Sequence, residues 1–103
     1  EVEPAMIGYG FHPDAQRDFV EAIQFYRKID PRLAEDFITA IDEGILAIRA
    51  NPRTWRALRK NIRRYLVRRF PFGIYYTHHV DSVTIWAVFH LSQKPDKWIT
   101  RLR

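Results

Sequence analysis

The residue types in this sequence that could do chemistry are mostly basic, and they gather in one stretch. Between Gly44 and Val80 the chain has nine bases and no Asp or Glu, whereas residues 1–43 have ten acids and four bases. A segment this one-sided concentrates positive potential and attracts an anionic partner, either nucleic acid or an acidic protein segment. A solvated basic face is the alternative, and charge alone does not decide between the two. The nine bases are Arg49, Arg53, Arg56, Arg59, Lys60, Arg63, Arg64, Arg68 and Arg69.

Histidines are the other candidates for chemistry. His78 and His79 are adjacent, and adjacent residues of a strand point to opposite faces, so this pair cannot chelate one ion. His90 lies near the end of an expected strand, where it could form a hydrogen bond or act as an acid–base group. The sequence shows no Ser or Cys nucleophile motif, paired-carboxylate signature or glycine-rich phosphate loop. We therefore expect no metal and no cofactor.

Two amphipathic helices are predicted in the N-terminal half. A first-turn proline at Pro13 opens an apolar stripe of helical period that runs to about Ile29. Asp30-Pro31 repeats this start signal, and a second stripe continues until Asn51-Pro52 stops it. Because the link between them is very short, the helices are expected to form an antiparallel hairpin that needs a partner surface for its apolar stripes.

The downstream sequence changes from helical period to alternation and predicts an antiparallel meander of three strands. Met6 to Phe11 could add a fourth strand at an edge, and Pro95 to Arg103 could close the chain as a short helix. The strands are expected at 65–70, 74–80 and 83–91, separated by a break at Pro71-Phe72-Gly73 and a two-residue turn at Asp81-Ser82.

The predicted fold class is therefore α+β, with the helical hairpin packed on one face of a three- to four-stranded antiparallel sheet. Such a sheet leaves its other face open to solvent. Since successive strand residues point to opposite sides, arginines within the strands can avoid the core. We expect the open face of the sheet to be basic.

Length and composition set the remaining expectations. The 103 residues are expected to form one domain, 1–103. No apolar run approaches the roughly 20 residues of a membrane span. The chain also has no cysteine and no recognisable secretion signal near its start. These features predict a cytoplasmic protein that is not attached to a membrane.

Several short segments of the chain occur in an order typical of one family. They are "FHPDAQRDFVEAIQFY", "NPRTW", Arg64-Tyr65-Leu66 leading into Phe70-Pro71-Phe72, Ile74-Tyr75-Tyr76, and Ala87-Val88 with His90, Pro95 and Trp98. From about Gly10 to Trp98 the chain resembles the RelE/ParE superfamily of toxins from bacterial type II toxin–antitoxin systems, often labelled plasmid stabilisation proteins. The resemblance implies two N-terminal helices against an antiparallel sheet. It also implies a growth-inhibiting toxin that a cognate antitoxin neutralises, so that a toxin–antitoxin hetero-oligomer is expected.

The two branches of this superfamily differ in what they poison. The resemblance implies one of two activities. RelE-like toxins cleave mRNA in the ribosome with basic residues on the sheet face, whereas ParE-like toxins inhibit DNA gyrase and lack those basic residues. Gly73 stands where the cutting branch has a mid-sheet arginine, and Leu91-Ser92-Gln93 stands where it has another. RNA cleavage of this kind needs strong cations at the scissile phosphate. We therefore favour a non-catalytic, ParE-like toxin, with the ribosome-dependent endonuclease and an inactive basic binding module as the alternatives.

Two sets of site residues follow from the resemblance and the charge pattern. If the chain cuts RNA, its catalytic candidates are Arg64, Arg68 and His90. In the second set, Trp98 has two interpretations, because it could cover an edge of the core or stack on a partner. The candidates for binding the antitoxin or the target are Arg59, Lys60, Arg63, Arg64, Arg68, Arg69, Lys97, Trp98 and Arg101.

Overall fold

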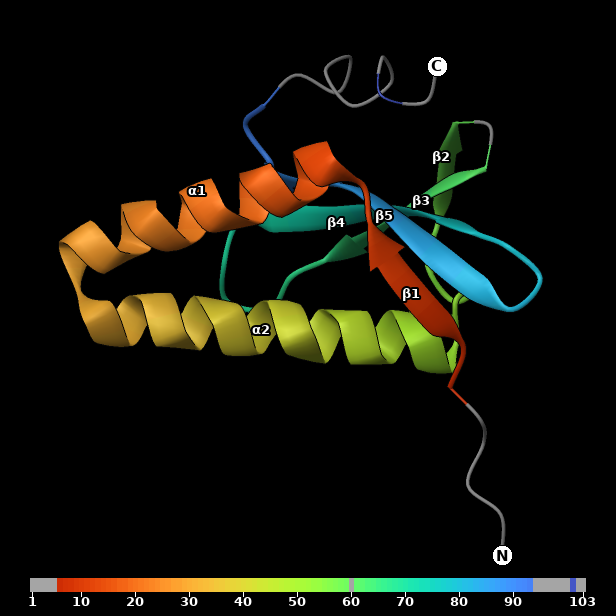
Figure 1. Ribbon diagram of the computed structural model, residues 1–103, viewed down its shortest axis with the longest axis horizontal. Coiled ribbons are helices and arrows are strands. Elements are labelled where there is room, and N and C mark those ends of the chain that lie inside the picture. Colours follow the sequence, from red (N-terminus) through yellow and green to blue (C-terminus); the bar gives the residue numbers. More distant parts are fainter. Residues whose placement is uncertain (1–5, 60, 94–100, 102–103) are drawn as a thin grey trace, which may run out of the picture.

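The computed structural model describes residues 6–59, 61–93 and 101, and has two helices against one face of a sheet (Figure 1). The helices form an antiparallel hairpin whose apolar stripes share one core with the sheet. The predicted α+β class is therefore confirmed. In chain order the elements are β1 (Gly8–Phe11), α1 (Pro13–Ile29), α2 (Pro31–Ala50), β2 (Ala57–Arg59), β3 (Ile62–Leu66), β4 (Phe72–His78) and β5 (Ser82–His90).

Short-range hydrogen bonds fix the ends of both helices. The Nδ1 atom of His12 accepts a hydrogen bond from the backbone N–H of Asp14 at 3.1 Å and caps α1. Asp30 then serves both helices. Its backbone N–H donates to the Tyr26 carbonyl at the end of α1, and its side chain accepts from the Arg32 N–H at 2.9 Å. One residue thus ends α1 and caps α2, as the sequence predicted.

The sheet has five strands in the order β1-β5-β4-β3-β2, one more than expected. The additional strand, β2, has only three residues, which is too short to show a strand period in the sequence. The expected edge strand is present as β1, but it runs parallel to β5, with Gly8 opposite Ser82. The sheet is therefore mixed rather than antiparallel. A hairpin turn sets the direction of neighbours such as β4 and β5, whereas no turn joins β1 to β5.

The bounds of the predicted strands are wrong at both turns. β3 ends at Leu66, four residues early, and Phe72 and Gly73 belong to β4 instead of a break. The chain turns before Pro71, with Arg69 in the left-handed region at φ 72°. At the other end of β4 the backbone N–H of His79 donates to the Ser82 carbonyl at 2.7 Å, so the turn lies one residue earlier than expected.

The side chains on both faces of the sheet are largely apolar and buried, so the prediction of a basic face open to solvent is wrong. Six consecutive residues of β4, from Phe72 to Thr77, are buried. In β5, the register shift opposite Tyr75 and Tyr76 leaves Trp86 as an extra residue, a β-bulge that places Trp86 and Ala87 on the same side. The face away from the helices carries a second cluster, made of Ile62, Tyr75, Ala87 and Phe89, with Leu58 and Trp86 packed against it.

A close approach of α2 to the sheet explains a glycine within that helix. A Cβ atom placed on Gly44 would lie 2.7 Å from Cε1 of Tyr65 and 3.0 Å from Cδ1 of Ile74. Real Cβ contacts are not this short, so only glycine lets the helix lie this close to β3 and β4.

Candidate basic binding surface

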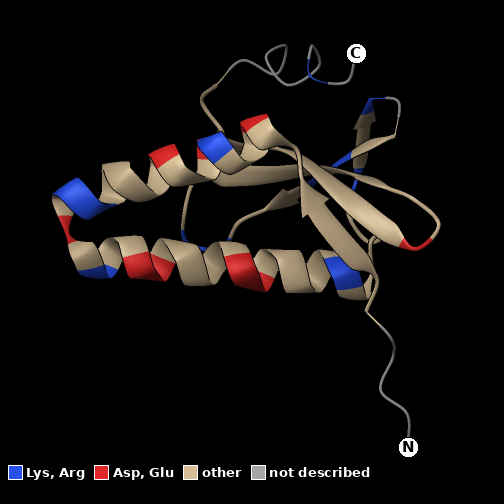
Figure 2. Ribbon diagram, in the orientation of Figure 1, with Lys and Arg blue, Asp and Glu red and all other residues tan. Residues whose placement is uncertain are grey.

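The acid-free block does not form one basic face in the structure. Arg63 and Arg64 are neighbours on β3, and alternation sends them to opposite sides of the sheet. Arg68 and Arg69 lie in the loop between β3 and β4. Figure 2 shows the acids along the two helices and at the turn after β4, away from β2 and β3. The positive charge is therefore divided among three places.

Arg64 lies on the face away from the helices and covers Gly73. A Cβ atom on Gly73 would lie 3.1 Å from both Cγ and Cδ of Arg64 and 3.2 Å from Cε1 of Tyr75. The methylene groups of Arg64 therefore crowd position 73, and a side chain there would require Arg64 to shift slightly. Arg64 also lines a shallow hollow beside β2, together with Trp55, Arg56, Leu58 and Leu66.

The two arginines of the β3–β4 loop face α2 and its acids. A guanidinium nitrogen of Arg69 lies 3.5 Å from a carboxylate oxygen of Asp36, and both side chains are more than half exposed. Arg68 and Arg69 line a hollow with Asp36 and Glu43 of α2. An exposed pair of this kind contributes little to stability, but it lowers the positive potential on this side of the molecule.

The other predicted binding residues have different environments. Arg59 is exposed at the end of β2, which is the edge strand of the sheet. Lys60, Lys97 and Trp98 lie outside the described residues. Arg49, the first base of the acid-free block, donates from Nε to the Ile7 carbonyl at 2.7 Å and lies over the ring of Tyr9. It therefore attaches β1 to the end of α2.

His90 lies on the helix side of the sheet, opposite to Arg64. Its ring contacts Phe72, and it lines a hollow of about 310 Å³ with Glu21 and Phe25 of α1. The Nδ1 atom of His90 is within hydrogen-bond distance of both the backbone N–H and the hydroxyl of Ser92, at 3.0 and 2.7 Å. Arg64, Arg68 and His90, the three catalytic candidates, therefore lie in three separate places.

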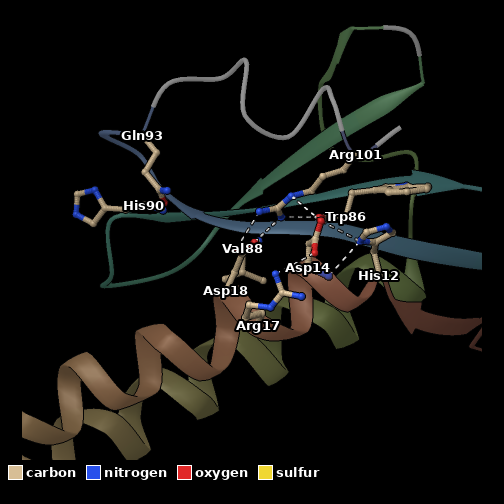
Figure 3. Close-up of polar contacts among 9 residues, drawn as sticks. All are labelled: His12, Asp14, Arg17, Asp18, Trp86, Val88, His90, Gln93 and Arg101. Atoms are coloured by element: carbon tan, nitrogen blue, oxygen red, sulfur yellow. Dashed lines mark hydrogen bonds and ion pairs between the residues drawn. The ribbon is translucent and has the colours of Figure 1, made fainter. Parts of the chain in front are cut away.

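Arg101 is held within the fold at the edge of β5 (Figure 3). Its Nη1 atom donates to Asp18 Oδ2 at 2.6 Å and to the Trp86 carbonyl at 3.0 Å, and its guanidinium lies over the ring of Phe89. Asp18 also accepts from the backbone N–H of Val88 at 3.1 Å. β1 pairs with β5 only as far as Ile85, so Asp18 and Arg101 bind backbone groups that the sheet leaves open.

The family follows from a match that covers most of these elements. A model of the "ParE toxin of type II toxin-antitoxin system, parDE" matches residues 9–95. The chain belongs to the ParE toxin family. A solved structure titled "Chromosomal ParDE TA system from P. aeruginosa" has a similar fold, with a TM-score of 0.71 at 18% sequence identity. The alignment covers 82% of this chain and 96% of that one. No curated protein sequence gives a significant match.

Membership of the ParE family confirms two predictions from the sequence. The chain is a toxin of a type II toxin–antitoxin system, and it belongs to the ParE-like rather than the RelE-like branch. The family implies an antitoxin as its partner. The resemblance of a solved ParDE structure at this low identity adds evidence for the fold alone.

Some site features could not be found from the sequence. Asp18 gave no signal, because an acid on an amphipathic helix is normally a solvent-exposed residue. Asn61 and His78 join Arg53 and Arg63 around a hollow, but these residues come from four separate segments of the chain. Among the described residues, no group of three or more His, Asp or Glu side chains could hold a metal ion. No helix in that part of the chain is long and apolar enough to cross a membrane.

Proposed function

We propose that this ParE-family toxin inhibits DNA gyrase by binding, without cutting RNA, and that its antitoxin neutralises it. The observation that carries the proposal is the separation of the basic groups. Phosphodiester cleavage needs several donors aimed at one developing charge. Arg64 lies on one face of the sheet, His90 on the other, and Arg68 beside α2.

The environment of Gly73 supports the same conclusion. A side chain at position 73, where the cutting branch is expected to have a mid-sheet arginine, would contact Arg64 so closely that Arg64 would have to shift by a few tenths of an ångström. The cutting branch is also expected to have an arginine just after its last strand, whereas residues 91–93 of this chain are Leu, Ser and Gln. A toxin that does not bring several cations to one phosphate would inhibit its target by binding to it. In this proposal the basic residues therefore bind the target and do not catalyse cleavage.

The same domain, residues 1–103, would bind the antitoxin through part of the basic block. Arg59, Arg63 and Arg64 lie on β2 and β3 at one end of the sheet, where an acidic segment of a partner would find little competing negative charge. Lys60, Lys97 and Trp98 stay candidates for the same surface. With gyrase as its target, the protein would work in the cytoplasm.

Two assays on the purified toxin test the proposal. In the first, gyrase supercoils relaxed plasmid, and we expect inhibition that added antitoxin reverses. In the second, primer extension on a translated message maps RNA ends, and we expect no cuts that depend on the toxin. Discrete cuts within ribosome-occupied codons that disappear in Arg64→Ala would overturn the proposal in favour of the endonuclease. An effect in neither assay would leave an inactive binding module.

A further inference from the structure

A hollow of about 380 Å³ lies where three basic segments meet at the end of the sheet. The chain after α2 contributes Arg53, β3 contributes Arg63, and β4 contributes His78 at its last position. Ala57 and Asn61 complete the lining. We name these five residues the arginine pocket. Among the residues that the structure describes, its lining contains two guanidinium groups, an imidazole and an amide, and no carboxylate.

Hydrogen bonds hold the framework of the arginine pocket in place. The Nη1 atom of Arg63 donates to the Trp55 carbonyl at 2.7 Å and to the Arg53 carbonyl at 3.3 Å. The hydroxyl of Tyr76, whose side chain is fully buried in β4, donates to the Pro52 carbonyl at 2.6 Å. The loop after α2 is therefore attached to both β3 and β4. Because both Arg63 bonds come from one nitrogen, the rest of its guanidinium fork can bind a ligand.

The electrostatics of the arginine pocket call for an anion. Burial is the largest cause that lowers the pKa of His78. The neighbouring charges of Arg53, Arg63 and His79 lower this pKa further. In the part of the chain that the structure describes, no acidic group opposes this lowering. Like charges held this close repel one another, and an anion placed among them would remove that repulsion.

We propose that the arginine pocket binds a phosphate group. Arg53, Arg63 and His78 come from three elements, so their donors approach the pocket from different directions. That arrangement suits a tetrahedral anion whose several oxygens each accept a hydrogen bond, more than a planar carboxylate with two oxygens. Arg53 and Asn61 are exposed, so a phosphate within a polynucleotide could reach the pocket as well as a free one. This proposal does not depend on gyrase being the target.

A matched pair of variants separates this pocket from general positive charge. Arg53→Gln removes a guanidinium from the arginine pocket. Arg56→Gln makes the same charge change three residues away, where Arg56 lines the other hollow, beside Trp55 and Arg64. Both arginines are exposed, so neither change should disturb folding. Circular dichroism melts of the two variants check this.

The experiment follows the imidazole signals of His78 by NMR during three titrations of the toxin. The probes are inorganic phosphate, a short single-stranded DNA and a glutamate-rich peptide. We expect phosphate or DNA to shift the His78 signals with saturation and to raise the pKa of His78, since a bound anion favours the imidazolium. Arg53→Gln should weaken that binding about tenfold, as for the loss of one charge-assisted hydrogen bond, and Arg56→Gln should leave it unchanged.

The pattern of responses decides the outcome. Binding of both phosphate and DNA with this dependence on Arg53 indicates a general phosphate site, and binding of DNA alone indicates a site for phosphodiesters of nucleic acid. Equal weakening by the two variants would overturn the proposal, since it would reflect net charge. Saturation by the peptide alone would also overturn it and assign the pocket to acidic side chains of a protein partner.

Discussion

Arginine side chains at two places in this toxin have opposite environments. At the edge of β5, Arg101 lies between Asp14 and Asp18 of α1 and also binds the Trp86 carbonyl. In the arginine pocket, Arg53 and Arg63 lie beside His78, and no carboxylate is among the described residues of the lining. Arginine therefore stabilises the fold at the edge of β5, where carboxylates are close to it. In the arginine pocket, arginine is available to bind a ligand.

The sequence explains why these two regions differ. The acids of α1 face the edge of β5, so a base that reaches this edge is neutralised. The segment from Gly44 to Val80 has no acid of its own, and the loop after α2, β2 and β3 all lie within it. The β3–β4 loop is intermediate, because Arg69 meets Asp36 of α2 across an exposed 3.5 Å pair.

The largest effect is expected from Asp18→Asn at the β5 edge. This change removes the nearer of the two carboxylates that pair with Arg101, whose side chain is only 16% exposed, and weakens the bond from the Val88 N–H. Arg101 then keeps only its 3.7 Å pair with Asp14, so the free energy of unfolding should fall by about 2 kcal/mol, less than for a buried charge left with no partner. Urea denaturation followed by circular dichroism measures it.

Asp36→Asn is the matched control, since it makes the same chemical change in an exposed pair with Arg69. It should cost less than about 0.5 kcal/mol. If the two variants lost equal stability, the contrast between a buried and an exposed pair would be wrong.

An intermediate effect is expected when charge is reversed on the basic side. Arg64→Glu should weaken binding of the antitoxin about tenfold at low salt, with the difference shrinking as salt screens it. Arg17→Glu makes the same charge change on α1, where Arg17 already pairs with Asp14, and should have little effect. Isothermal titration with the antitoxin at two salt concentrations measures both. Similar losses in the two variants would remove the special role of the β2–β3 side.

The smallest effect is expected from Tyr76→Phe, which releases the loop of the arginine pocket from β4. Losing the bond to the Pro52 carbonyl should cost about 1 kcal/mol at neutral pH. The wild type should also lose stability in alkali. Burial raises the pKa of Tyr76 to about 12, so between pH 10 and 12 the unfolded chain releases this proton and the folded chain keeps it.

Denaturation of both proteins across that pH range isolates the contribution of Tyr76. It is fully present below the unfolded pKa of 10 and disappears as the pH rises towards 12. The gap between wild type and Tyr76→Phe should narrow over this range. A gap that stays constant to pH 12 would mean that the hydroxyl ionises as easily in the folded protein as in the unfolded one.

The parts of the fold that could be predicted are those set by nearby residues. Asp30 ends one helix and caps the next through bonds that span two to four residues, and such signals are visible in the sequence. The prediction of a strand at 65–70 was wrong because alternation of residue type alone does not show where a strand ends and the chain turns. Val67 and Phe70 are both buried on the helix side, and the turn between them places Arg68 and Arg69 outside the sheet.

The sequence by itself determined the two helices, the acid-free block and the absence of arginine at position 73. These depend on residue type and on spacing along the chain. Only the tertiary structure decided which arginines are neutralised. Asp18 and Arg101 are 83 residues apart, and they meet because β5 runs beside α1. Arg63 and Arg64 are neighbours in sequence but lie on opposite faces, because alternation separates them. The strength of an ionic interaction depends on distance and burial, and packing of the whole chain sets both.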